Sequence, residues 1–317
     1  MFEKMRNKKN LLAFSAGTDS SALFHMLEEN NIQFDMIMVN YNTREESKKE
    51  VEFAKNKNKH LHLLETNLDL EKGSNFEKVA RDIRYEFFDK EMINYDNLIL
   101  GHNLSDKVEW FLMQFIKGAG VKELYGMETE SERKDYTILR PILDLSKEEI
   151  LKYLKKNNIE YFYDKSNDNK KFTRNFIRHN FSEKLLKEGK KGILKTFKIL
   201  EKEKKHLPKE KLIEKNKEYC KYEIKFEFAA GVISRYLKER GYLLSGGQRN
   251  EFEEKEEITV KSKDKGYYSA TYREGYLYIS PYDNSVMPKK IKEEMREKKI
   301  PPKHRRYLSK VQSKNMI

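Results

Sequence analysis

The chain has 317 residues, of which 38% are hydrophobic, so it is long enough for two domains with cores of their own. Its formal net charge of +13 predicts a polyanionic partner, and the alternative is a generally lysine-rich surface. The single cysteine, Cys220, excludes an intramolecular disulfide, a Cys-x-x-Cys zinc site and two-thiol redox chemistry. We expect neither a signal peptide nor a membrane span near the charged first ten residues, and hence a cytoplasmic protein.

The segment from Leu11 to Leu27 predicts a strand, a tight turn and a helix. An apolar run, Leu11–Phe14, stops at a loop of small residues, Ser15–Ser20, and an apolar-periodic stretch follows. Such a turn directs backbone N–H groups and the positive end of a helix at one point, which favours an anion. The loop lacks the Gly-Lys-Ser/Thr ending of a Walker loop. The simpler alternative is an ordinary turn closed by a capping Ser or Asp.

The rest of the first half alternates predicted strands and helices. We expect strands at Phe34–Asn40, His60–Glu65, Leu98–Leu100 and Thr137–Leu139, and helices at Arg44–Asn56, Phe76–Met92 and Ser105–Lys117. This order is typical of the α/β class, with a parallel, Rossmann-like sheet and helices on both faces. Ligands of such sheets bind beyond the carboxyl ends of the strands. Three polar segments lie at those ends and predict one site: Ser15–Ser20, Asn40–Arg44 and Gly101–Asp106.

The segment Gly101–Glu109 adds two carboxylates to this site. Asp106 and Glu109 are three residues apart, so they share one face of the predicted helix. Two carboxylates beside a phosphate loop suit Mg²⁺ or an ammonium group. Ser105 or Asp106 could instead simply cap the helix. We expect His102 to line the site and do not assign it as a base.

These two segments carry a resemblance to known enzymes. Ser15–Ser20 resembles the Ser-Gly-Gly-x-Asp-Ser pyrophosphate loop of the N-type ATP pyrophosphatases, which cleave ATP between the α and β phosphates and adenylate a substrate. Ala16 replaces the first Gly, a change that requires a negative φ at this position. Gly101–Glu109 is similar to the Gly/Ala-His-x-x-x-Asp-x-x-Glu-Thr pattern of the tRNA(Ile)-lysidine synthetase family. Trp110 replaces its Thr, which we interpret as a packing change.

Further segments resemble the same family in the same order, over roughly residues 10–182. They are Val39–Arg44, Asn75–Tyr85, Leu139–Leu143, and Asp164–Asn167 followed by Arg174–Arg178. Within the first of them, Tyr41 and Thr43 stand where the family has His and Leu. The last two segments separate this family from the rest of the superfamily.

The resemblance implies an ATP-dependent carbon–nitrogen ligase with ATP and Mg²⁺ as cofactors and free L-lysine as a substrate. The other substrate would be isoleucine tRNA with a C-A-U anticodon, modified at carbon 2 of its wobble cytidine through an adenylated intermediate. ATP-binding candidates are Ser15, Ala16, Gly17, Thr18, Asp19, Ser20, Asn40 and His102. Catalytic candidates are Asp19, Asp106, Glu109, Arg84 and Arg174, with Mg²⁺ on Asp19 and Asp106. Candidate tRNA contacts are Arg81, Arg178 and Asn175.

Two assignments stay open within this set. The sequence does not divide Mg²⁺ and lysine among the three carboxylates. Arg81 and Arg84 could also form an ordinary solvated helix face, whereas Arg174 and Arg178 are four residues apart and would converge on a phosphate.

The second half predicts a smaller α+β region. We expect a catalytic domain at residues 1–185, and a helical connector with a tRNA-binding domain at 186–317. Helices are expected at Gly189–His206 and Phe228–Tyr242, and hairpin strands at Ile258–Lys263 and Gly266–Ile279, whose tyrosines could stack on bases or form one face of a small sheet. Ser245–Gln248 superficially echoes a phosphate loop, but we interpret it as a turn that begins a helix. Lys289–Arg306 resembles the carboxyl end of short lysidine synthetases.

Three rival functions remain. A tRNA sulfur transferase of the same superfamily is disfavoured by the lone Cys220. An adenylating ligase for a small metabolite would not need the basic second half. A non-catalytic RNA-binding homologue is suggested by Ala16 and Trp110, and disfavoured by the retained carboxylates and Arg174. The sequence leaves the oligomeric state undetermined, with a homodimer among the alternatives.

Overall fold

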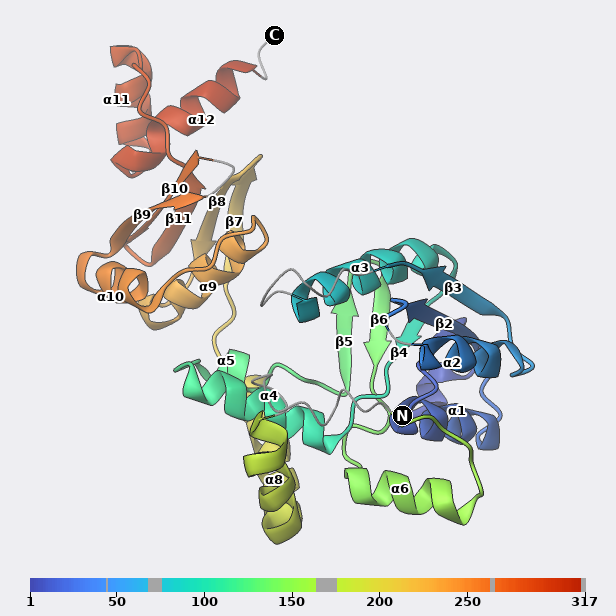
Figure 1. Ribbon diagram of the computed structural model, residues 1–317. Helices are drawn as coiled ribbons and strands as arrows, with labels where there is room; N and C mark the ends of the chain where they lie inside the picture. Colours follow the sequence, from blue (N-terminus) through green and yellow to red (C-terminus); the bar gives the residue numbers. More distant parts are fainter. Residues whose placement is uncertain (44, 68–75, 164–175, 263–265, 315–317) are drawn as a thin grey trace. The chain divides into compact units, whose positions relative to one another are not determined.

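The computed structural model describes residues 1–43, 45–67, 76–163, 176–262 and 266–314 (Figure 1). The chain divides into two units, Met1–Lys205 and His206–Ile317. The boundary expected after residue 185 lies inside α8 (Glu183–Lys204), a helix that belongs to the first unit. Among the described residues, no helix is long and apolar enough to cross a membrane.

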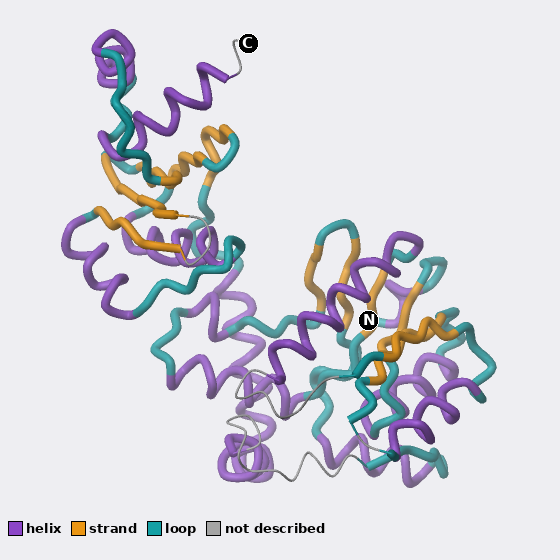
Figure 2. The backbone as a smooth tube through the Cα atoms, turned by 45° about the horizontal axis from the view of Figure 1, so that its top comes forward, coloured by secondary structure: helices purple, strands orange, loops and turns teal. Residues whose placement is uncertain are grey.

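The first unit is built on a six-stranded sheet in the order β3-β2-β1-β4-β6-β5. Figure 2 shows the strands in orange. The strands are β1 (Asn10–Ala13), β2 (Asp35–Asn40), β3 (Leu61–Glu65), β4 (Asn97–Ile99), β5 (Glu130–Arg133) and β6 (Tyr136–Leu139). All five predicted strands are confirmed, and they are parallel. The edge strand β5 was not predicted and runs antiparallel to β6, so the sheet is mixed. Its sequence, Glu-Ser-Glu-Arg, carries no apolar alternation, as suits an exposed edge.

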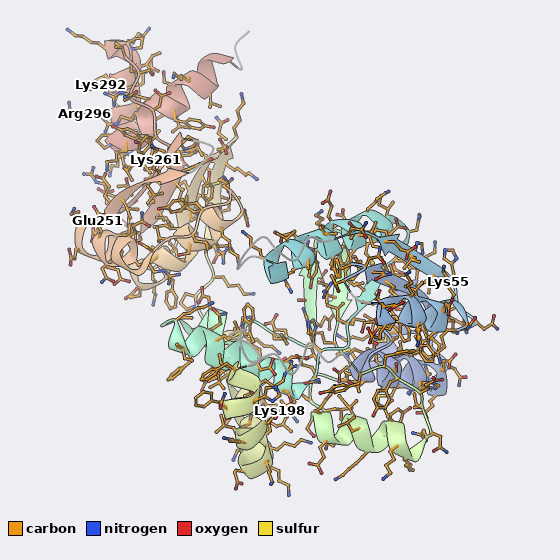
Figure 3. All side chains as sticks on the ribbon, viewed as in Figure 1. Lys55, Lys198, Glu251, Lys261, Lys292 and Arg296 are labelled. Carbon is orange, nitrogen blue, oxygen red and sulfur yellow. The ribbon has the colours of Figure 1, made fainter. Side chains whose placement is uncertain are left out.

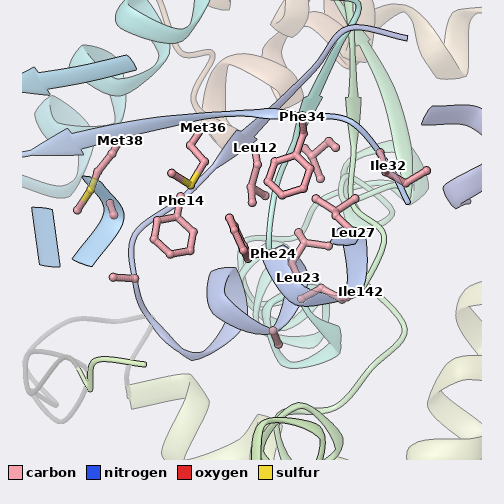
Figure 4. Packing of buried hydrophobic residues seen from close by; sticks show 14 of the residues in the cluster. Leu12, Phe14, Leu23, Phe24, Leu27, Ile32, Phe34, Met36, Met38 and Ile142 are labelled. Carbon is pink, nitrogen blue, oxygen red and sulfur yellow. The ribbon is translucent and has the colours of Figure 1, made fainter. Parts of the chain in front are cut away.

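Helices cover both faces of this sheet. The helices of the first unit are α1 (Thr18–Glu29), α2 (Glu46–Lys55), α3 (Phe76–Glu91), α4 (Leu104–Ile116), α5 (Val121–Leu124), α6 (Lys147–Lys156) and α8, with the short helical segments η1 (Phe2–Met5), η2 (Met92–Asn94) and η4 (Arg178–Ser182). Residues of α1, α2 and α6 pack with Leu12 on one face (Figure 4). Residues of α3 pack with Leu11 on the other. Adjacent strand residues point to opposite faces, so a doubly covered strand is apolar throughout.

A third apolar cluster joins α4 to α5 and α8, and Trp110 of α4 contacts Glu123 of α5 and the space beside Gly126. The Trp110 Nε1 donates to the carbonyl oxygen of Glu123 at 3.0 Å. A Cβ at Gly126 would lie only 2.6 Å from the same nitrogen, so the indole occupies space that Gly126 leaves open. The tryptophan is therefore accommodated by local packing, as the sequence interpretation held.

The second unit contains a five-stranded antiparallel sheet in the order β7-β8-β11-β10-β9. Its elements are β7 (Lys211–Asn216), β8 (Tyr219–Glu223), α9 (Phe226–Lys238), α10 (Gly246–Lys255), β9 (Glu257–Ser262), β10 (Gly266–Arg273), β11 (Tyr276–Pro281), α11 (Lys289–Glu297) and α12 (Pro302–Lys314). One face packs against α9 and α10, and the other against α11 and α12. The α+β character predicted for this region is confirmed.

Two details of the second unit correct or confirm the sequence analysis. The prediction of one strand over Gly266–Ile279 was wrong, because the chain reverses at Glu274 and Gly275, with φ of 51° and 82°, and forms β10 and β11. Strands β7 and β8 were also missed. The turn at Ser245 does begin a helix: its side chain accepts from the Gln248 backbone N–H, and the Gln248 side chain accepts in return, as a capping box.

His304 anchors α12 to the sheet of the second unit. It is fully buried, with Nδ1 2.8 Å from the Ser280 hydroxyl and Nε2 3.1 Å from the Thr271 hydroxyl. Two tyrosine rings, Tyr219 and Tyr278, lie beside the imidazole. Burial, with a smaller effect of the Lys303 charge, lowers the pKa of His304 to about 3. The folded protein therefore holds a neutral imidazole at this position.

We expect the free energy of unfolding to fall as the pH is lowered from about 6.5 to about 3. In this window the unfolded chain protonates His304 and the folded chain does not, so one such group contributes a slope of up to about 1.4 kcal/mol per pH unit. Urea denaturation at a series of pH values measures it. His304→Gln should be less stable and lose this part of the slope, whereas His206→Gln, at an exposed position, should retain it. Equal slopes in all three proteins would contradict the assignment.

Candidate active site

The loop between β1 and α1 closes on itself through serine hydroxyls. The Ser15 backbone N–H donates to Ser20 Oγ at 3.2 Å, and Ser20 Oγ donates to the Gly17 carbonyl at 3.1 Å. Gly17 is the N-cap of α1 and brings no side chain to the helix end. The first turn of α1 therefore presents backbone N–H groups at the carboxyl end of β1, which is the geometry of an anion site.

Ala16 adopts a conformation that the sequence analysis did not expect. Its φ is +58°, so the expectation of a negative φ was wrong. The loop needs this left-handed residue because its carbonyl must turn toward the Phe162 N–H, which donates to it at 2.8 Å, and toward the Ser21 hydroxyl at 3.3 Å. Alanine in this region costs about 1–2 kcal/mol. The Ala16 methyl group is fully buried in the core, which offsets part of that cost.

The second polar loop, after β4, touches the first one. A Cβ at Gly101 would lie 3.4 Å from the carbonyl carbon of Asp19 and from the backbone N of Ser20. Asn103 begins α4: its side chain accepts from the Ser105 and Asp106 N–H groups, and Asp106 Oδ2 accepts from the Asn103 N–H at 2.9 Å. The N-cap is therefore Asn103 and not Ser105 or Asp106, and Asp106 takes part in the capping box, which fixes its carboxylate at the start of α4. His102 lies half-buried on the same loop.

Asp106 and Glu109 share one face of α4, as predicted from their spacing, and both face Arg178. The Arg178 Nε lies 2.6 Å from Glu109 Oε1, and Nη2 lies 3.1 Å from Oε2 and 3.5 Å from Asp106 Oδ1. The Glu109 side chain is fully buried. A buried carboxylate requires a charged partner with good geometry, which this two-point pair supplies. The guanidinium of Arg178 is thus bound to two carboxylates of α4.

Asp19 pairs with a residue that the sequence analysis missed. The Lys147 Nζ lies 2.9 Å from each carboxylate oxygen of Asp19 and also contacts Thr18 Oγ1. Burial raises the pKa of Asp19, the Lys147 charge opposes that effect, and the nearby Asp106 charge adds to it. The Asp106 charge therefore acts on Asp19, although the Lys147 charge has the larger effect.

The polar segment after β2 forms a separate part of the rim. The Asn40 side chain donates to Asn42 Oδ1 at 2.8 Å and to Glu65 Oε1 at 3.3 Å, which orders the turn and ties it to β3. Tyr41 receives a hydrogen bond from Arg84 Nε at 3.3 Å and donates to the Ala80 carbonyl at 2.6 Å. This tyrosine, in place of the family's histidine, therefore positions an arginine of α3.

The remaining arginine of α3, Arg81, lies over the ring of Tyr85, with the guanidinium carbon 4.6 Å from the ring centre. Both Arg81 and Arg84 are exposed and have aromatic partners. Arg174 and Asn175 lie outside the described residues, as do Arg44, Asn75 and the Asp164–Asn167 segment. The structure therefore brings together the Ser15–Ser20 loop, Asp106, Glu109 and Arg178, and places Asn40, Arg81 and Arg84 along β2 and α3.

The donor chemistry suits Mg²⁺ bound jointly with phosphates. Asp19 and Asp106 offer the carboxylate oxygens that Mg²⁺ prefers, and magnesium at phosphate sites commonly takes one or two carboxylates plus phosphate oxygens. Within the described ranges, no group of three or more His, Cys, Asp or Glu side chains forms a metal site by itself. The nucleotide would thus have to complete the ligand set.

The sequence indicates the helix that carries Lys147, but not the contact that Lys147 makes. Lys147 follows the predicted fifth strand by eight residues and lies in Ser146-Lys-Glu-Glu149, a capping-box pattern that begins a helix at the same end of the sheet. Nothing in that pattern indicates that the lysine turns toward the loop, because the contact with Asp19 spans 128 positions of the chain.

Replacing Ala16 by glycine should leave the free energy of unfolding nearly unchanged, whereas Ala22→Gly should lower it by about 2 kcal/mol. Both alanines are fully buried in the same core, so each change removes one buried methyl group. Glycine relieves the positive φ at residue 16 but weakens the helix at residue 22. Urea denaturation of the two variants measures the difference. Equal destabilisation would show that residue 16 carries no strain.

Comparisons with known proteins agree on the family. The model of the PP-loop domain matches residues 1–185. A tRNA(Ile)-lysidine synthase of Campylobacter jejuni is 41% identical over 310 residues, which cover 96% of this chain and 93% of that protein. The corresponding enzyme of Wolinella succinogenes is 36% identical, with 96% and 94% covered.

Among solved structures, a U34-tRNA thiolase, NcsA from Methanococcus maripaludis, has a TM-score of 0.50 at 21% identity, covering 62% of this chain and 72% of that one, and supports the fold. Together with the loop, the carboxylate pair and the Arg178 contact, these matches show that the chain belongs to the tRNA(Ile)-lysidine synthase family of PP-loop, ATP-using enzymes.

Proposed function

We propose that this chain ligates free L-lysine to carbon 2 of the wobble cytidine of isoleucine tRNA with a C-A-U anticodon. The cytosine O2 attacks the α-phosphate of ATP and pyrophosphate leaves. The lysine ε-amine then attacks carbon 2 and AMP leaves with that oxygen. The observation that carries the proposal is a phosphate loop, Ser15–Ser20, in contact with the loop that leads into a helix with two carboxylates, in a chain similar over 96% of its length to a tRNA(Ile)-lysidine synthase.

The loop residues would hold the departing phosphates. The N–H groups at the start of α1 lie at the positive end of the helix, so they would stabilise the charge that grows on the pyrophosphate. Mg²⁺, held by Asp19 and Asp106 with the nucleotide, would neutralise part of the same charge. Asn40 and His102 would line the nucleotide site at the neighbouring strand ends.

The carboxylates would also serve the incoming lysine. Its ε-amine has an ordinary pKa of about 10.4, so it arrives protonated and must lose a proton before it attacks. Asp106 and Glu109 face the same guanidinium, that of Arg178. An exchange of partners would let this pair hold the substrate ammonium next to the activated carbon. The geometry does not divide Mg²⁺ and lysine among the three carboxylates.

The arginines are proposed contacts of the tRNA. Arg84, positioned by Tyr41, and Arg174 would contact the activated cytidine or its phosphate, and Arg81, Asn175 and Arg178 would contact the neighbouring backbone. The second unit adds a basic surface: Lys292 and Arg296 of α11 and Lys261 of β9 are exposed (Figure 3). Such contacts release counterions, so tRNA binding should weaken steeply as salt rises.

We expect the purified chain to incorporate radiolabelled lysine into the C-A-U isoleucine tRNA in the presence of ATP and Mg²⁺. The elongator methionine tRNA, which has the same anticodon, is the matched control and should stay unlabelled. The label should resist mild base, because a carbon–nitrogen bond has formed instead of an aminoacyl ester. ATP converted to AMP and pyrophosphate without labelling of either tRNA would contradict the substrate assignment and retain the adenylating chemistry.

Asp106→Asn should lower the rate of lysine incorporation by about 10²–10⁴-fold. The asparagine Oδ1 can still accept from the Asn103 N–H, so the start of α4 is retained while the negative charge is lost. Filter binding of the tRNA and the thermal unfolding midpoint should be nearly unchanged, and Asp135→Asn, at an exposed turn, should behave as the wild type. Loss of tRNA binding with unchanged turnover of bound tRNA would contradict this role.

A further inference from the structure

Lys147, the first residue of α6, places an ammonium group at the phosphate loop. Its Nζ lies 2.9 Å from both carboxylate oxygens of Asp19 and contacts the hydroxyl of Thr18, the first residue of α1. Under the proposed function, that end of α1 receives the pyrophosphate part of ATP. The ammonium therefore lies at the point where the β- and γ-phosphates would bind.

The position of α6 does not require this contact. A capping box between Ser146 and Glu149 begins the helix, and Ile150 and Leu154 bury its apolar face in the core that includes α1. The Lys147 side chain is 40% exposed. Partly exposed ion pairs contribute little to stability, so the pair with Asp19 has no evident structural purpose.

The electrostatic field at the start of α1 indicates which kind of ligand the Lys147 ammonium would bind. A cation at the N-terminal end of a helix is disfavoured by the macrodipole, because that end is already positive. The Asp19 carboxylate balances the positive charge of the Lys147 ammonium. A polyanion bound at the same place would be attracted by both the helix end and the ammonium. The arrangement thus suits an anionic ligand that arrives and departs.

The side chain also has the freedom to exchange partners. A lysine has a flexible four-carbon stem and three donor hydrogens, so its ammonium can contact phosphate oxygens while it leaves Asp19 or continues to touch it. This exchange requires no displacement of α6, because the residues that fix that helix are elsewhere along it.

We propose that Lys147 binds the β- and γ-phosphates of ATP and neutralises charge on the departing pyrophosphate, and that it returns to Asp19 when the site is empty. The inference rests on the proposed use of ATP at this loop. Lys147 would be a phosphate-binding residue on α6, a helix outside the Ser15–Ser20 and Gly101–Glu109 motifs.

The test compares ligands that contain these phosphates with one that lacks them. Isothermal titration calorimetry of the full chain with ATP, pyrophosphate and AMP, each with Mg²⁺, gives the three affinities. Loss of one charge-assisted hydrogen bond in Lys147→Met should weaken ATP and pyrophosphate binding by at least about tenfold and change AMP binding by less than about twofold. Lys147→Arg, which keeps the charge, should recover most of the loss. Lys152→Met, on the same helix and 73% exposed, is the matched control and should bind all three as the wild type.

The outcomes separate this inference from the proposed function. Unchanged ATP affinity in Lys147→Met, or equal weakening of ATP, pyrophosphate and AMP, would overturn the phosphate-binding role, the second result because it marks a general disturbance of the loop. Failure of the wild-type chain itself to bind ATP would overturn both. The thermal unfolding midpoint of each variant shows that the compared proteins are folded.

Discussion

The buried carboxylate of Glu109 is the constraint on which much of the first unit depends. A charge without solvent must have a partner, and here the partner is Arg178, 69 residues further along the chain. Arg178 begins the η4 turn that leads directly into α8, so satisfying Glu109 also docks that turn against α4. The apolar cluster of Leu104, Tyr125 and Phe197 then completes the junction of α4, α5 and α8. One ion pair thus couples α4 to a distant segment of the chain.

The same principle organises the rim of the sheet. Asp19 pairs with Lys147 and Glu109 with Arg178, so under the proposed function the chain's own cations stand where a substrate or metal cation would bind. Ligand binding would then exchange the partners of carboxylates that are already paired. Glu109 is fully buried, so for this carboxylate the exchange would cost less than removing water from a free carboxylate.

Two kinds of feature could be predicted from the sequence: strands with continuous apolar runs, and polar motifs that directly follow such strands. The inner parallel strands were found because both of their faces are buried and their apolar runs are continuous, as in Leu11–Phe14. The polar edge strand β5 and the turn at Gly275 were missed, because an exposed edge needs no apolar pattern and a tyrosine-rich alternation continues across the turn. Site residues next to strands were placed from their motifs. Lys147 was not, and Arg178 was named from its motif as a tRNA contact and not as the partner of Glu109, because both contacts join distant segments, which no local spacing encodes.

The left-handed Ala16 has a consequence for how this loop can change. Alanine and glycine codons differ by one base, so a single point mutation can replace Ala16 by glycine, which adopts a positive φ without strain. Any larger residue would have to adopt the same positive φ and also place its side chain where the Ala16 methyl group already has no exposed surface. We therefore expect alanine or glycine at this position, and a mutation from either one to the other keeps the conformation of the loop.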